Sequence, residues 1–224
     1  MAELEKVSLV TKDGVEIVGD HYKSDLTIGH TILAAHMMPA DRKSWKDFAE
    51  VANLAGYDLL AIDLRGHGES VNKGGQKIDY HNFTDREHQE SIKDLEAAMD
   101  FLSEKGIEES QMTLMGASIG SSLCLQLMKT NVNLYTGVLL SPGSNYRGID
   151  TEAFATGLSG PQSVLLVGGD KDQQSYGSLK KLKSLIRGSV ETIVVPNEAH
   201  GTELFTGHPK LMVRILAWLN EEIS

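Results

Sequence analysis

The sequence is poor in cysteine, in positive charge and in long apolar runs. Its single cysteine, Cys124, excludes a disulfide within the chain, and we therefore expect a cytoplasmic protein. With 21 basic and 31 acidic residues the formal net charge is −10, which argues against a nucleic-acid partner. Residues 1–20 contain no long apolar run, so we predict neither a signal peptide nor a transmembrane helix and expect no membrane partner.

Short apolar runs alternate with longer segments of helical periodicity along the rest of the chain. Residues 4–22 read as two strands joined by the turn signal KDG, which predicts an antiparallel hairpin. Six further strands are expected from short runs bounded by Gly, Pro or Asp, at 30–36, 57–63, 111–116, 135–141, 162–168 and 191–196. Helices are expected between them, at 44–56, 86–106, 118–129, 178–188 and 208–222. The last of these has Pro209 at a first helical position.

This alternation predicts an α/β fold. Strands that alternate with helices form right-handed crossovers and hence a mainly parallel, twisted, eight-stranded sheet with helices on both faces. The chain has 224 residues and no repeat, low-complexity tract or linker, so we expect one domain spanning 1–224.

The stretch GASIG, residues 116–120, places a serine between two glycines at the joint of a predicted strand and a predicted helix. Gly116 and Gly120 allow the close strand-to-helix approach that a nucleophile elbow requires, and the turn would expose the hydroxyl of Ser118. Ser118 would also lie at a helix N-terminus, where free N–H groups favour developing negative charge. Because Gly and Ser are common, the pattern alone also fits an ordinary turn, and the flanking strand and helix favour the nucleophile.

A serine nucleophile needs a base and an orienting acid, in the chain order Ser, Asp or Glu, His. Of the eight histidines only His200 and His208 follow Ser118, and His200 comes directly after the strand expected at 191–196. His208 lies beside Pro209 at a helix start and is expected to cap that helix or to be exposed. The residues alone leave three acids open: Asp150, Asp170 and Asp172.

With these motifs the chain resembles the α/β-hydrolase superfamily, over about residues 14–222. The motifs that carry the resemblance are HMMPADRKSW, AIDLRGHGES, GASIG, LVGGDKD and NEAHG. The family pattern G-x-x-D, matched at residues 169–172, implies that Asp172 is the triad acid. It also implies an oxyanion hole formed by the backbone N–H groups of Ile119 and Met38, the latter in a loop that usually reads His-Gly-x.

The resemblance also implies what is missing. Many relatives insert a helical cap before the acid strand, whereas only about 20 residues, PGSNYRGIDTEAFATGLSGP, occupy that place here. One short helix is expected near 151–157, with no cap domain. Near neighbours in shape, the dienelactone-hydrolase-like enzymes, carry a cysteine nucleophile, while this chain has Ser118 and an expected buried apolar Cys124.

The leading hypothesis is a serine hydrolase of carboxylesterase type. It would act on a small acyl substrate through Ser118, His200 and Asp172 and an acyl-enzyme intermediate. We expect no cofactor and no metal, because no Cys/His metal-ligand spacing occurs. The same triad also suits thioesterase, lactonase, amidase or C–C hydrolase chemistry, and a non-catalytic binding module on this fold is a further alternative. We expect a monomer or a homodimer.

Overall fold

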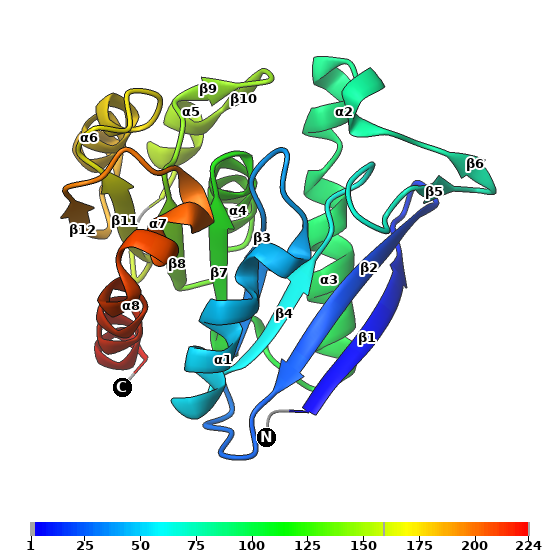
Figure 1. Cartoon of the computed structure of the whole chain (residues 1–224), viewed down its shortest axis with the longest axis horizontal. Coiled ribbons are helices and arrows are strands. Elements are labelled where there is room, and N and C mark those ends of the chain that lie inside the picture. The colour runs from blue at the N-terminus through cyan, green and yellow to red at the C-terminus, as the bar shows by residue number, and fades with distance from the viewer. Residues whose placement is uncertain (1–2, 159, 224) are drawn as a thin grey trace.

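A mixed β-sheet forms the centre of the structure, a computed structural model that describes residues 3–158 and 160–223 (Figure 1). Residues 1, 2, 159 and 224 of the predicted domain lie outside the described part. Within that part, the long strands are β1 (Glu3–Val10), β2 (Val15–Lys23), β3 (Thr31–Ala35), β4 (Asp58–Ile62), β7 (Met112–Ala117), β8 (Thr136–Leu140), β11 (Ser163–Gly169) and β12 (Ser189–Val195). These agree with the eight predicted strands.

The long strands lie in the order β1-β2-β4-β3-β7-β8-β11-β12. The hairpin strands β1 and β2 are antiparallel to each other, and β2 is antiparallel to β4. The pairs from β4 to β12 are all parallel. A two-residue hairpin of β5 (Asn72–Lys73) and β6 (Gln76–Lys77) extends the sheet beside β2. Because the six strands from β3 to β12 are parallel, their carboxyl ends meet at one edge, where ligands of such sheets bind.

Helices cover both faces of the sheet (Figure 1). They are α1 (Lys46–Leu54), α2 (Asp85–Gln89), α3 (Ile92–Glu104), α4 (Ile119–Thr130), α5 (Thr151–Ala155), α6 (Tyr176–Leu185), α7 (Leu204–Gly207) and α8 (Pro209–Glu222). Side chains of α3, α4 and α6 pack with Leu33 on one face, whereas those of α1 and α8 pack with Ile32 on the other. Alternate residues of a strand point to opposite faces, so each parallel strand supplies both cores.

Two details differ from the sequence-based expectation. The helix predicted over 86–106 is divided into α2 and α3, because the N–H groups of Ser91 and Asp94 bond to carbonyls three residues back, which tightens the turn between them. The predicted helix 44–56 begins as a 3₁₀ turn, Arg42–Trp45, before α1. Pro209 is the first residue of α8, as predicted.

The segment between β8 and β11 is small. It holds the two-stranded hairpin β9 (Asn145–Tyr146) and β10 (Ile149–Asp150), followed by the five-residue helix α5. Within the described residues it holds no cap domain, and its short helix lies where one was predicted. Among the described residues, this segment thus places only the hairpin and α5 above the carboxyl edge of the sheet (Figure 1).

Candidate active site

Ser118 occupies the turn between β7 and α4. Its backbone is left-handed, with φ 52° and ψ −113°, a conformation that non-glycine residues adopt at a cost of about 1–3 kcal/mol. The Ser118 N–H donates to the carbonyl of Leu140 at 2.9 Å, and the Ser121 hydroxyl donates to the carbonyl of Gly116 at 2.8 Å. Neighbouring strand and helix thus hold the strained turn, and Ser118 stands at the carboxyl edge of the sheet.

The two glycines of GASIG are required by packing. A Cβ on Gly116 would overlap the backbone of Gly120 and Ser121, and a Cβ on Gly120 would overlap the carbonyls of Ala35 and His36. The start of α4 therefore lies directly against β7 and against the end of β3. This is the close approach that the sequence pattern predicted.

Asp172 and His200 come together from loops after β11 and β12. The Nδ1 of His200 lies 2.7 Å from Oδ2 of Asp172, although 28 positions separate them in sequence. Asp172 is buried, and the side chain of His200 is about a quarter exposed, at 24%. The hydrogen bond fixes the imidazole with Nδ1–H toward the carboxylate, which leaves Nε2 to act as a base.

The carboxylate of Asp172 has further donors that sequence reasoning missed. The hydroxyl of Ser175 donates to the same Oδ2 at 2.5 Å, and the N–H of Gln174 donates to Oδ1 at 3.1 Å. Burial by itself raises the pKa of Asp172, but the hydrogen bonds from Ser175 and His200 outweigh it, and the net pKa lies below the ordinary value. The spacing Asp-x-x-Ser before a predicted helix was the available signal for Ser175.

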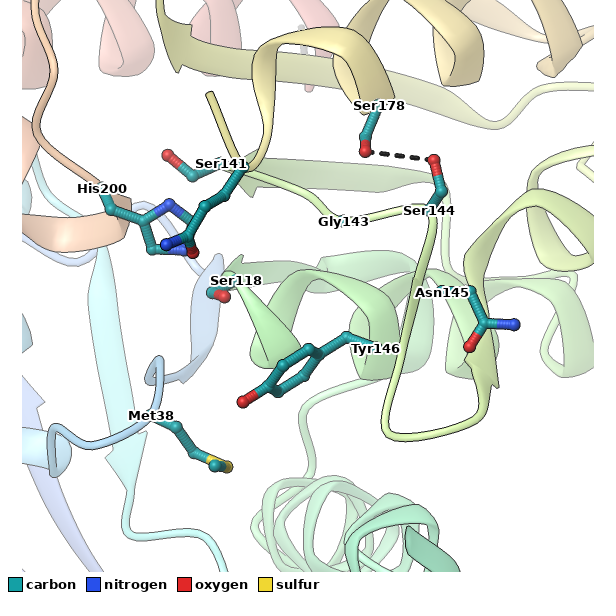
Figure 2. Close-up of a pocket in the computed structure, with 10 residues that line it drawn as sticks. Met38, Ser118, Ser141, Gly143, Ser144, Asn145, Tyr146, Ser178 and His200 are labelled. Carbon is teal, nitrogen blue, oxygen red and sulfur yellow. Dashed lines mark hydrogen bonds between the residues drawn. The ribbon is translucent and has the colours of Figure 1, made fainter. Parts of the chain in front are cut away.

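A cavity of about 280 Å³ opens at this edge of the sheet and contains both Ser118 and His200 (Figure 2). Its described lining residues are Met38, Ser118, Ser141, Gly143, Ser144, Asn145, Tyr146, Gln174, Ser178 and His200. Among the hydrogen bonds of these residues, none joins the hydroxyl of Ser118 to the imidazole directly. Such contacts are often looser before substrate binds. Both side chains therefore face one cavity beside which a small substrate could lie.

Of the two predicted oxyanion donors, Met38 lines this cavity and Ile119 directly follows Ser118. Ile119 is the first residue of α4, and N–H groups in a first helical turn have no partner within the helix. The backbone N–H of Met38 makes no hydrogen bond within the described residues. The Met38 side chain lines the cavity, whereas that of Met37 belongs to the core and packs beside Gly201.

A second strained serine supports the loop that carries His200. Ser141 is fully buried at the end of β8 with φ 47°, and its Oγ accepts a hydrogen bond of 2.9 Å from the N–H of Gly201. No local sequence pattern pointed to this residue. Its contact spans 60 positions in sequence and fixes the backbone directly after His200.

The competing candidates have other surroundings. Asp150 accepts a hydrogen bond from the N–H of Ala153 and caps α5, and Asp170 is exposed in the turn after β11. His208 is the N-cap residue just before α8, but its side chain makes no capping hydrogen bond. His36 is buried and braces its loop, because its Nδ1 bonds to the carbonyl of Met37 and its Nε2 accepts the N–H of Leu64.

Three further properties of the described residues bear on function. Cys124 is a free, fully buried thiol, and burial raises its pKa. No group of three or more His, Cys, Asp or Glu side chains in residues 3–158 and 160–223 is placed to hold a metal ion. No helix of that part is both long and apolar enough to cross a membrane.

The sheet order, the tight elbow after β7 and the loops that follow β11 and β12 define an α/β hydrolase. More narrowly, the chain belongs to the family described as serine aminopeptidase, S33, whose model matches residues 30–159. This membership supports hydrolase activity. No curated protein sequence matches the chain.

Solved structures share the whole fold. The esterase Pf2001 of Pyrococcus furiosus is 17% identical, with a TM-score of 0.77 over 98% of this chain and 90% of its own. A thermophilic esterase from Thermogutta terrifontis is 15% identical, with a TM-score of 0.77 over 98% of this chain and 100% of its own. An alpha-beta serine hydrolase homologue from Coxiella burnetii is 20% identical, with a TM-score of 0.72 over 95% of this chain and 97% of its own. At such identities the likeness establishes the fold alone.

Proposed function

We propose that this chain is a serine hydrolase that cleaves carboxylic esters of small acyl groups. The observation that carries the proposal is the 2.7 Å contact between Asp172 and His200, with His200 and the strained Ser118 on one cavity. Neither contact nor cavity follows from sequence proximity, because the three residues come from the ends of three different strands.

The proposed reaction has two steps. The Ser118 Oγ attacks the acyl carbon while Nε2 of His200 takes its proton, and the C–O bond of the ester breaks as that proton passes to the departing alkoxide. Water then loses a proton to His200 and releases the acid, and the proton returns to Ser118. Asp172, ionised at neutral pH, holds the tautomer and stabilises the imidazolium in both steps.

The N–H groups of Met38 and Ile119 are the proposed oxyanion donors. They would bind the negative oxygen that develops in each tetrahedral intermediate, next to the N-terminus of α4. One such donor contributes on the order of 10²–10³ in rate. The chemistry requires no metal or organic cofactor.

Aminopeptidase activity, which the family description suggests, is less well supported by the cavity. A free peptide amino terminus is a cation, and a carboxylate is its usual partner. Among the described residues that line the cavity there is no Asp or Glu. A neutral ester fits this lining better than a peptide amino terminus.

Replacement of Ser118 tests the proposal. We expect Ser118→Ala to lower kcat for p-nitrophenyl acetate by on the order of 10⁶ with an unchanged circular dichroism spectrum, because the nucleophile is lost. The matched control is Ser103→Ala, at an exposed serine of α3, which should behave as the unaltered chain. A fluorophosphonate probe should label the unaltered chain and Ser103→Ala but not Ser118→Ala. Folded protein that neither cleaves esters nor reacts with the probe is a binding module, and the proposal is then wrong.

A further inference from the structure

The lining of the cavity is polar but carries no fixed charge. Apart from His200, its polar groups are hydroxyls and amides: Ser141, Ser144, Asn145, Tyr146, Gln174 and Ser178, besides Ser118. No Asp, Glu, Lys or Arg of the described residues lines it. A charged substrate group that left water here would find no opposite charge, which is strongly unfavourable. A hydroxyl or carbonyl group of a substrate could form hydrogen bonds with these hydroxyls and amides.

The cavity is also small. Its volume of about 280 Å³ lies just under the range of about 300–1,000 Å³ usual for small-molecule sites. Part of that space must hold the reacting carbonyl beside Ser118. This volume suits a short acyl group.

Tyr146 of β9 offers the hydroxyl that is best placed to recognise such a group. Figure 2 shows its hydroxyl pointing toward the space between Ser118 and Met38. The residue is 40% exposed, and its hydroxyl makes no hydrogen bond to a described residue. A phenol can both donate and accept a hydrogen bond, so this one is free for a substrate.

The loop that carries Tyr146 is held from several sides. The amide of Gln89 on α2 donates to the carbonyl of Arg147 at 3.0 Å, and Asp85 lies 3.6 Å from the Arg147 guanidinium. The hydroxyl of Ser144 donates to Ser178 on α6 at 3.0 Å, drawn as the dashed line in Figure 2. A side chain on a loop anchored to two helices is pre-organised, which lowers the entropy lost when it binds substrate.

The position of Tyr146 assigns it to the acyl side of the substrate. Figure 2 shows His200 and Tyr146 on opposite sides of Ser118. The leaving group must lie toward His200, which gives it a proton, so the acyl group extends toward Tyr146 and Met38. We propose, resting on the esterase function above, that the substrates are esters of short, uncharged acyl groups that carry an oxygen, and that the Tyr146 hydroxyl binds that oxygen.

The test compares two p-nitrophenyl esters of equal size. The 3-hydroxybutanoate carries a hydroxyl where the 3-methylbutanoate carries a methyl group. We expect kcat/KM to favour the hydroxy ester by about 2- to 12-fold, the value of one neutral hydrogen bond, and Tyr146→Phe to abolish that preference. The matched control is Tyr135→Phe, at a tyrosine that is 37% exposed and does not line the cavity, which should keep the preference.

Two charged esters test the neutrality of the site. Mono-p-nitrophenyl succinate is anionic, and the p-nitrophenyl ester of β-alanine is cationic. Both should have kcat/KM at least about 10-fold below that of the hydroxy ester. A charged ester that equals it, or a preference that survives in Tyr146→Phe, overturns the proposal.

The outcomes separate this proposal from the one on which it rests. Hydrolysis of p-nitrophenyl acetate by the unaltered chain, with equal rates for the hydroxy and methyl esters, overturns the substrate class alone. Failure to cleave the acetate, together with no fluorophosphonate labelling, overturns both.

Discussion

Removal of the Ser175 hydroxyl gives the sharpest test of how the acid is held. Ser175 is fully buried, and its hydroxyl shares Oδ2 of Asp172 with the imidazole of His200. Ser175→Ala would leave the buried carboxylate with one donor fewer. A hydrogen bond to a charged group contributes about 1.5–3 kcal/mol, so the free energy of unfolding should fall by about that amount at neutral pH. For a chain of this size the melting temperature should fall by about 3–12 °C.

The same change should slow turnover. If the whole energy of the lost bond is felt in the transition state, where Asp172 stabilises the imidazolium, kcat falls by about 13- to 160-fold. A smaller share of that energy gives a smaller loss. The matched control is Ser184→Ala, an exposed serine of α6 whose hydroxyl bonds only to the carbonyl of Lys181 among the described residues. It should leave kcat unchanged.

The pH dependence distinguishes a carboxylate effect from simple loss of packing. The folded pKa of Asp172 lies below the ordinary aspartate value, so ionised Asp172 stabilises the fold at pH values above about 3.9. That contribution disappears as the pH falls through the folded pKa. The difference in melting temperature between the unaltered chain and Ser175→Ala should therefore shrink below about pH 4. The measurements are calorimetric melts at several pH values and ester hydrolysis at neutral pH. A kcat within about twofold of normal, or a stability loss equal at acid and neutral pH, refutes the reasoning.

Two further predictions concern the elbow and the buried histidines. Gly120→Ala should lower the free energy of unfolding, measured in urea, by about 1–3 kcal/mol or more, because the new Cβ would overlap carbonyls at the end of β3 and in the following loop. The control is Gly177→Ala, at an uncrowded glycine of α6, which should raise the free energy of unfolding by about 0.5–1 kcal/mol. Equal effects of the two changes would mean that the elbow does not need its glycine. Burial lowers the pKa of His30, His36 and His67 to about 4. Between about pH 6.5 and 4 these histidines are therefore protonated in the unfolded chain but neutral in the folded chain. The free energy of unfolding should fall over that window by up to about 1.4 kcal/mol per pH unit for each histidine, and a urea midpoint constant from pH 6.5 to 4.5 would contradict this.

The helices and strands were largely predictable because their signals are local. Short apolar runs predicted six of the eight long strands, β-branched residues around the KDG turn predicted the other two, and the glycine-bounded serine predicted the elbow. These signals are local because strand period, helix period and turn chemistry depend on neighbours in sequence. The break between α2 and α3 was not predicted from this local pattern. Just after the break, Asp94 accepts hydrogen bonds from the backbone N–H and the guanidinium of Arg65, a contact that spans 29 positions and lies outside any local pattern.

Of the candidate site, too, one part was predictable from the sequence and another part was not. The glycine-bounded pattern at the joint of a predicted strand and helix selected Ser118, and chain order together with the position after the strand expected at 191–196 selected His200. Order did not choose among Asp150, Asp170 and Asp172, and only the family pattern at residues 169–172 implied Asp172. The fold places Asp172 against His200, uses Asp150 as a helix cap and leaves Asp170 in solvent.

By itself, then, the sequence determined the α/β architecture and the serine at its elbow, because periodicity and turn chemistry act over a few residues. Only the tertiary structure decided that Asp172 contacts His200, that Ser175 bonds to Asp172 and Ser141 to the loop of His200, and that Tyr146 borders the cavity. Each of these contacts joins groups whose side-chain directions are set by packing around them. Hydrogen bonds act over about 3 Å, so such contacts exist only once packing has fixed both partners.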